Sequence, residues 1–89
     1  MKAAWYENIG AAGEVLQVGE TIDPTPNAGE VLIEIKASGV NPSDVKTRAG
    51  ARGELQFPQI IPHSDGGGVI TAVGEGIDEN RIGERVWIW

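Results

Sequence analysis

Apolar and polar residues alternate most regularly over residues 30–38. The apolar positions fall on every second residue: Val31, Ile33, Ile35 and Ala37. This period of two predicts an antiparallel strand with one half-buried face and one solvated face. A slip of one residue would turn Glu34 and Lys36 toward the core, so the pattern also predicts a firmly set register.

Shorter apolar runs predict four more strands, over residues 2–6, 15–19, 69–73 and 85–89. Residues 8–13 are expected to form a flexible connection, and the prolines of residues 23–29 a stiff turn. Three consecutive glycines, Gly66–Gly68, lead into the strand at residues 69–73. Two interpretations of them stay open: they bend the strand, which we favour, or they bring its backbone close to a neighbour or ligand.

Residues 41–50 predict the one short helix of the chain. Asn41 is a favourable N-cap, Pro42 suits the first helical position, and Gly50 tolerates the left-handed conformation that ends a helix. Asp44 falls in the first turn, where the helix dipole favours an anion. On local chemistry alone, Asn41 and Asp44 need do no more than start this helix.

Five short strands, one helix, 13 glycines and 5 prolines together predict an all-β chain with a barrel or sandwich architecture. The last residues, Val86–Trp89, have the composition of a strand interior and no polar tail. An exposed apolar strand invites pairing with another chain. We therefore expect the sequence to be a piece of a longer protein, and pairing of copies through that edge is compatible with it.

Composition narrows the functional classes. A net charge of −6 with no Lys/Arg cluster argues against nucleic-acid binding. The absence of cysteine excludes disulfides and thiolate metal sites. The start of the chain lacks the apolar run of a signal peptide, and no stretch is long enough to span a bilayer. We predict a soluble, cytoplasmic protein that does not bind membranes.

Common catalytic motifs are missing. Neither the G-x-G-x-x-G fingerprint nor a Walker motif occurs, and no serine has the context of a nucleophile elbow. His63 is the only histidine and has only Asp65 as a close acidic neighbour, so the residues indicate a solvated loop side chain rather than a zinc ligand. Lys46 and Arg48 lie two positions apart on the helix and are expected on different faces.

Several segments, taken in order, resemble one family. They are Pro26–Leu32, Ser38–Asp44, Lys46–Gly50, Pro62–Ile70, Val73–Ile77 and Gly83–Val86. Together they resemble the N-terminal GroES-like domain of the medium-chain dehydrogenase/reductase superfamily. Within it, the chain is most similar to the zinc-free quinone oxidoreductases, which include zeta-crystallin. The resemblance extends over essentially all of residues 1–89.

The resemblance implies a partly open GroES-like β-barrel with one short helix, and a Rossmann cofactor domain that lies outside this chain. In the family the active site lies in the cleft between these two domains. The resemblance places Asn41 and Asp44 in that cleft near the nicotinamide. It places residue 46 beside the cofactor, where many relatives carry tyrosine. Lys46 at this position would replace ring stacking with a contact to phosphate.

The resemblance also bears on metal and mechanism. Zinc-dependent members carry cysteine where this chain has Asn41 and histidine where it has Ser64, so two ligands are replaced and no catalytic zinc is expected. The implied reaction is hydride transfer from NADPH to a quinone or an enone. Asn41 would donate a hydrogen bond to the developing negative charge, and Asp44 would fix the loop or its water. The chain alone is expected to be inactive.

An alternative of a different class is a free-standing GroES-like binding or structural module, similar to a co-chaperonin or a crystallin. Such a module requires a mobile loop with an apolar tip. Residues 51–61 contain the apolar side chains for it, namely Leu55, Phe57, Ile60 and Ile61. In the resembling family, however, this loop lies on the substrate side. The alternative therefore stays second to the reductase.

Overall fold

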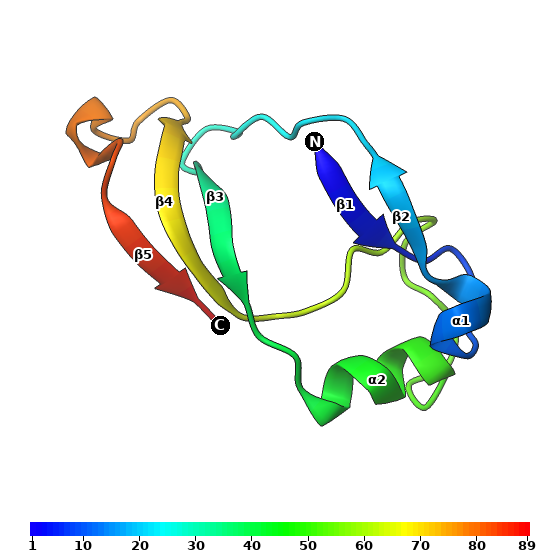
Figure 1. Ribbon diagram of the computed structural model, residues 1–89. Helices are drawn as coiled ribbons and strands as arrows, with labels where there is room; N and C mark the ends of the chain where they lie inside the picture. Colours follow the sequence, from blue (N-terminus) through cyan, green and yellow to red (C-terminus); the bar gives the residue numbers. More distant parts are fainter. The chain divides into compact units, whose positions relative to one another are not determined.

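The computed structural model describes residues 1–89 and is mostly strand, as predicted. Its strands are β1 (Lys2–Trp5), β2 (Gln17–Glu20), β3 (Val31–Ser38), β4 (Gly66–Val73) and β5 (Arg85–Ile88) (Figure 1). Its helices are α1 (Ala12–Val15), α2 (Pro42–Ala49) and the 3-10 turn η1 (Glu79–Arg81). The five strands and the helix at residues 42–49 match the elements expected from the sequence, whereas α1 and η1 were not anticipated.

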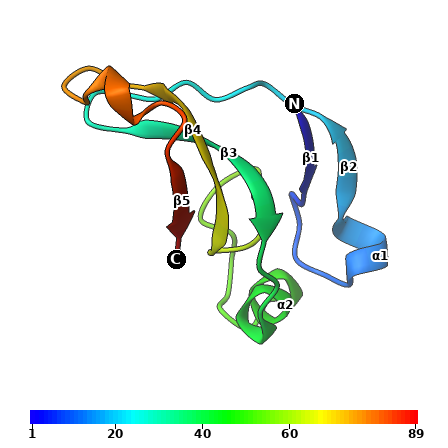
Figure 2. The ribbon, with the colours of Figure 1, turned by 60° about the vertical axis from the view of Figure 1, so that its left-hand side comes forward.

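The strands form two antiparallel sheets. One has two strands in the order β1-β2, and the other has three in the order β3-β4-β5, seen from two directions in Figures 1 and 2. No strand pairing joins the two sheets into a closed barrel. The chain divides accordingly into a first unit, Met1–Ile22 with Val40–His63, and a second unit, Asp23–Gly39 with Ser64–Trp89.

The first unit is held together around Tyr6. β1 and β2 pair from Lys2 opposite Glu20 to Trp5 opposite Gln17. Immediately after β1, Tyr6 and Ile60 exchange two backbone hydrogen bonds of 2.9 Å. The Tyr6 side chain is only 2% exposed. The loop that precedes β4 in sequence is thus tethered to the end of β1 by one buried residue.

The prediction for residues 12–16 is wrong. In place of a flexible connection followed by a strand from Val15, the chain makes the short helix α1. The backbone N–H groups of Val15 and Leu16 donate to the carbonyls of Ala11 and Ala12, each at 3.0 Å. Because these donors are already used, the β-ladder begins only at Gln17. The apolar pair Val15-Leu16 suits either structure, so the sequence pattern does not distinguish them.

Helix α2 forms as its sequence predicts. Asn41 occupies the N-cap and makes a capping box with Asp44, in which the backbone N–H of Asn41 donates to Oδ2 of Asp44 at 2.7 Å. Pro42 begins the helix, and Gly50 ends it in the left-handed conformation with φ 99°. The local interpretation of Asn41 and Asp44 as helix-starting residues is confirmed.

The second unit departs from a uniform ladder. The β3–β4 register shifts between Leu32 and Ile33 and again between Ile35 and Ala37. Glu34 and Lys36, which a slip of one residue would turn toward the core, nevertheless stay exposed. Ile35 is 45% exposed, although the alternation groups it with core positions. A bulge of this kind leaves one residue unpaired and bends the strand.

Two of the three glycines at the start of β4 make this irregular pairing sterically feasible. A Cβ on Gly68 would lie 2.1 Å from the carbonyl oxygen of Glu34, and one on Gly66 would lie 2.7 Å from that of Ala37. Figure 1 also shows that β4 is curved. The glycines therefore serve both of the roles left open by the sequence: they bend the strand and admit a neighbouring backbone. Gly67 differs, because its Cβ would meet nothing closer than the Val86 carbonyl oxygen at 3.7 Å.

The one fully buried side chain of the second unit belongs to Ile70, which is 1% exposed. Its N–H donates to the Glu84 carbonyl at 3.0 Å, and its own carbonyl accepts from the Gly83 N–H at 2.8 Å. These two bonds hold the turn that contains η1 against the middle of β4. They also fix where β5 begins, and so the register in which its side chains face those of β4.

We predict that Gly68→Ala destabilises the chain by about 2–3 kcal/mol, because the new methyl group collides with backbone that cannot rotate away. Gly67→Ala is the matched control, because the same methyl group one residue away would meet only the Val86 carbonyl oxygen, at 3.7 Å. Urea unfolding followed by circular dichroism measures both variants. Equal unfolding midpoints for the two variants would contradict the close-approach argument.

We predict that Asn41→Ala lowers the free energy of unfolding by about 1 kcal/mol through loss of the N-cap. Asn41→Ser should keep nearly the wild-type free energy of unfolding, since serine caps helices about as well as asparagine. Urea unfolding followed by circular dichroism measures the free energy of unfolding of both variants. If serine costs as much as alanine, Asn41 stabilises the chain by something other than capping.

Candidate functional site

A hollow of about 200 Å³ lies beside α2 in the first unit, and we call it the α2 hollow. Its lining residues come from α1, α2 and the segments next to them: Ala12, Leu16, Val40, Asp44, Val45, Arg48, Pro62 and His63. The walls are mainly apolar, with three groups that can form hydrogen bonds. This mixture is typical of small-molecule sites.

The two charged groups of α2 in this hollow are held by backbone. Asp44 accepts the hydrogen bond from the Asn41 N–H. One turn further on, Nη1 of Arg48 donates to the Gly10 carbonyl at 2.5 Å, and the Arg48 carbonyl accepts from the Gly10 N–H at 3.0 Å. These bonds fix the two side chains before any ligand arrives, so the hollow is preorganised along this face of the helix.

The predicted site residues are only partly brought together. Asp44 lines the α2 hollow, and Asn41 is hydrogen-bonded to it without lining the hollow. Lys46 is exposed, and its carbonyl accepts from the Ala51 N–H at 3.0 Å at the end of α2. Arg48, two residues away, is bonded to Gly10. Lys46 and Arg48 thus have different surroundings, as their spacing predicts.

His63 lines the same hollow and has an unusual backbone. Its φ is 85°, the one positive φ outside glycine in this chain. Histidine is among the few residues that tolerate this region, at some cost in energy. The side chain is exposed, which agrees with the expectation of a solvated loop residue. Neither Pro62 nor Ser64 requires this backbone conformation at His63, so the residues beside His63 did not predict it.

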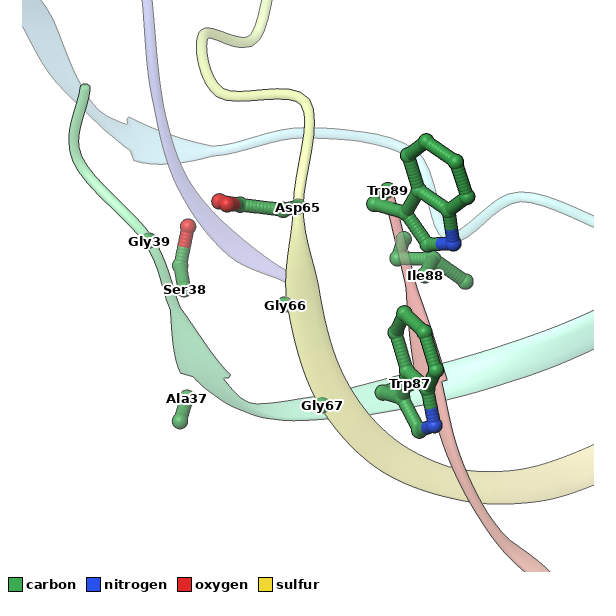
Figure 3. A pocket seen from close by; sticks show the side chains of 9 residues that line it. All are labelled: Ala37, Ser38, Gly39, Asp65, Gly66, Gly67, Trp87, Ile88 and Trp89. Atoms are coloured by element: carbon green, nitrogen blue, oxygen red, sulfur yellow. The ribbon is translucent and has the colours of Figure 1, made fainter.

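A second and larger hollow, of about 420 Å³, lies within the second unit where β3 ends, β4 begins and β5 ends; we call it the sheet hollow (Figure 3). It is lined by Ala37, Ser38, Gly39, Asp65, Gly66, Gly67, Trp87, Ile88 and Trp89. None of the site residues expected from the sequence lies in it. Sequence reasoning treated the two tryptophans only as strand residues, although their spacing of two already places them on one face.

The sheet hollow combines aromatic, anionic and bare backbone surfaces. The ring centroids of Trp87 and Trp89 are 6.4 Å apart and their planes differ by 18°. Both side chains are exposed, at 73% and 89%. On the β3 side, the Asp65 carboxylate lies over Gly39, so close that a Cβ on Gly39 would fall 2.0 Å from Oδ1. Gly39 must stay a glycine for Asp65 to take this position.

The residues of this chain do not fit a zinc site. No group of three or more His, Cys, Asp or Glu side chains is gathered where a metal ion would be held. The chain has no cysteine. If Asn41 and Ser64 take the positions of zinc ligands, as the resemblance implies, their amide and hydroxyl would be poor substitutes for thiolate and imidazole. No helix is both long and apolar enough to cross a membrane.

Comparisons with known proteins agree on the family. The family described as "Alcohol dehydrogenase GroES-like domain" matches residues 27–89. An alcohol dehydrogenase of Moraxella sp. is 40% identical over 88 residues, which are 99% of this chain and 25% of that protein. A second relative, the class-3 alcohol dehydrogenase of Cereibacter sphaeroides, is 41% identical over 75 residues, 84% of this chain and 20% of that protein.

Solved structures indicate the same family as the sequence comparisons. A structure described as a putative NADPH:quinone reductase from Bacillus thuringiensis superposes with a TM-score of 0.85 at 30% identity, covering 97% of this chain and 26% of that one. A thermostable alcohol dehydrogenase from Pyrobaculum aerophilum also has a TM-score of 0.85, at 38% identity, covering 98% of this chain and 25% of that one. The chain thus spans about a quarter of the length of these relatives. The expected GroES-like resemblance is confirmed, and the chain belongs to the alcohol dehydrogenase GroES-like domain family of the medium-chain dehydrogenases/reductases.

Proposed function

We propose that this chain is the catalytic GroES-like domain of an NADPH-dependent oxidoreductase that reduces a quinone or an enone without zinc. The observation that carries the proposal is the start of α2, where the Asp44 carboxylate accepts from the Asn41 backbone N–H and the Asn41 side chain accepts from the Asp44 backbone N–H, in a chain without cysteine. Support also comes from structural relatives: a mycobacterial quinone oxidoreductase has a TM-score of 0.83 at 31% identity, and a mycobacterial protein solved with NADPH has 0.80 at 32%.

A nicotinamide cofactor, when bound, supplies the hydride chemistry. The residues of this chain supply position and hydrogen bonds. In the proposed arrangement, capping uses the amide oxygen of Asn41, and its NH₂ group donates to the substrate carbonyl oxygen as negative charge develops there. Asp44 is a positioning residue, because it holds the Asn41 backbone N–H at 2.7 Å and so sets the direction of the amide.

Lys46 has a separate role in the proposal. Its ammonium is exposed and forms no ion pair, so a phosphate group of the cofactor would not have to displace a protein carboxylate. Lysine binds phosphate as a flexible point charge rather than in a fixed bidentate geometry. The contact therefore contributes to affinity and not to the chemical step.

A second candidate is alcohol oxidation, favoured by the 40% identical Moraxella alcohol dehydrogenase. That reaction needs a group that lowers the pKa of the alcohol, and zinc is the usual one. The donor set of this chain offers no zinc site, which ranks this candidate second. The third hypothesis is a GroES-like module that binds a partner without turnover. It predicts no activity with either class of substrate.

The first test measures NADPH oxidation by the protein expressed from the complete reading frame. We expect turnover with quinones and enones that survives treatment with a metal chelator. Alcohol oxidation abolished by the chelator would replace the proposal with the second candidate. A complete reading frame that ends at Trp89, or a product inactive with both substrate classes, would favour the binding module.

In that protein, we predict that Asn41→Ser lowers kcat about tenfold or more, because removal of one preorganised donor to an oxyanion commonly costs this much or more. Serine retains the cap, so the unfolding midpoint should remain that of the wild type. This variant separates catalysis from folding. Wild-type kcat in a stably folded Asn41→Ser protein would remove Asn41 from the mechanism.

For Lys46→Gln we predict a rise in KM for NADPH of about two- to fivefold, the range expected for loss of one exposed ion pair, with kcat unchanged. The effect should shrink as salt is added, because exposed charges are screened. Arg52→Gln is the control, since it removes one positive charge from an exposed position of the same unit. Equal effects of the two variants would mean that only net charge matters.

A further inference from the structure

The proposed reaction adds a hydride and a proton to its substrate, and only the hydride comes with the nicotinamide. The proton has to come from a side chain of the site or from water. Most residues that line the α2 hollow are apolar, namely Ala12, Leu16, Val40, Val45 and Pro62. The others are Asp44, Arg48 and His63. A proton donor among the lining residues therefore has to be one of these three.

Two of the three side chains are not suited to give up a proton. Asp44 accepts the hydrogen bond from the Asn41 N–H at 2.7 Å, so its carboxylate is held as an acceptor. Nη1 of Arg48 donates to the Gly10 carbonyl at 2.5 Å, and arginine does not lose its proton in proteins. Histidine, in contrast, changes its charge between about pH 5 and pH 8 and is the most frequent general acid of enzymes. His63 is thus the lining residue whose chemistry suits proton transfer.

The backbone of His63 has a conformation that this chain otherwise gives to glycine. Its φ of 85° lies within the range of 79° to 99° covered by Gly29, Gly50, Gly53, Gly76 and Gly83. No other residue outside glycine has a positive φ. A side chain in this region costs energy that glycine would avoid. Histidine at this position is therefore not explained by stability, and strain of this kind is typical of functional sites.

We propose that His63 is the general acid of the α2 hollow and protonates the substrate after the hydride has been added. With an enone, the hydride adds to the β-carbon, the π-bond between the α- and β-carbons opens, and an enolate forms. The N–H bond of the His63 imidazolium then breaks, its proton bonds to the α-carbon, and the electron pair of that N–H bond stays on the ring. The neutral imidazole regains a proton from water, which reaches it because His63 is exposed. The inference rests on the proposed function for the hydride step.

The charged groups that line the hollow with His63 have opposite signs. Asp44 and Arg48 lie four positions apart on α2 and so share one face of the helix. The lining residues of α1, Ala12 and Leu16, are apolar. The walls therefore carry no net charge that would exclude the imidazolium before the transfer or the neutral imidazole after it. Water is the other source of the proton, but a water donor leaves the strained backbone of His63 without a role.

The test compares His63→Asn with the wild type in the protein expressed from the complete reading frame, with NADPH and cyclohex-2-en-1-one. Asparagine tolerates a left-handed backbone as histidine does, but its amide does not release a proton. We expect kcat to fall about a hundredfold or more with KM nearly unchanged, because a positioned general acid contributes about this much. In the wild type, kcat should decrease as the pH rises from about 6 to about 9, since the protonated imidazole is the active form. The variant should lack this decrease.

His63→Gly allows a rescue experiment. Its urea unfolding midpoint should stay close to that of the wild type, because relief of the strain at φ 85° offsets the greater flexibility of the unfolded chain. Imidazole in solution should restore part of the lost kcat, since it can occupy the vacated position and deliver a proton. The control compound is 1,3-dimethylimidazolium, which has the same ring without an N–H and should restore nothing. Imidazole should not raise kcat of the wild type.

Wild-type kcat in folded His63→Asn would overturn the inference and leave the proposed function in place, with water as the source of the proton. A loss of kcat that imidazole does not repair, or a pH dependence that persists in the variant, would also overturn it, because either result gives His63 a structural role only. Failure of the wild type to oxidise NADPH with any enone or quinone would refute the proposed function, and the general acid with it.

Discussion

The close approach of β3 and β4 is the constraint on which the second unit depends. Two backbones can come this near only because Gly66 and Gly68 have no side chains to separate them. The approach coincides with the register shift after Ile35, and it keeps the start of β4 free of side chains on both faces. In β5, Trp87 consequently lies opposite Gly67, which offers it no side-chain neighbour.

In the first unit the corresponding constraint is the start of α2. A capping box fixes Asn41 and Asp44 for reasons of helix stability alone. The same geometry points backbone N–H groups and the positive end of the helix dipole toward the N-terminus, where developing negative charge is stabilised. Structural and catalytic roles are therefore not competing explanations for these residues. Capping makes the amide rigid, and a rigid donor is the kind that lowers a barrier.

Local signals in the sequence were sufficient for α2, because the N-cap, Pro42 and Gly50 act within one segment. They failed at residues 12–16, where the apolar pair Val15-Leu16 suits helix and strand alike. The sheet hollow was also missed. Its parts come from three strands, and its floor is defined by the absence of a side chain. Periodicity along one strand predicts which residues share a face, but the hollow depends on which residues lie opposite.

In the proposed mechanism, Asn41 and Lys46 would act on different kinetic constants. A hydrogen bond from the Asn41 side chain would strengthen as charge grows on the carbonyl oxygen, so its loss would lower kcat. A contact from Lys46 to a cofactor phosphate would be nearly the same in the ground state and the transition state, so its loss would raise KM. The two variants therefore separate stabilisation of the developing charge from binding of the cofactor.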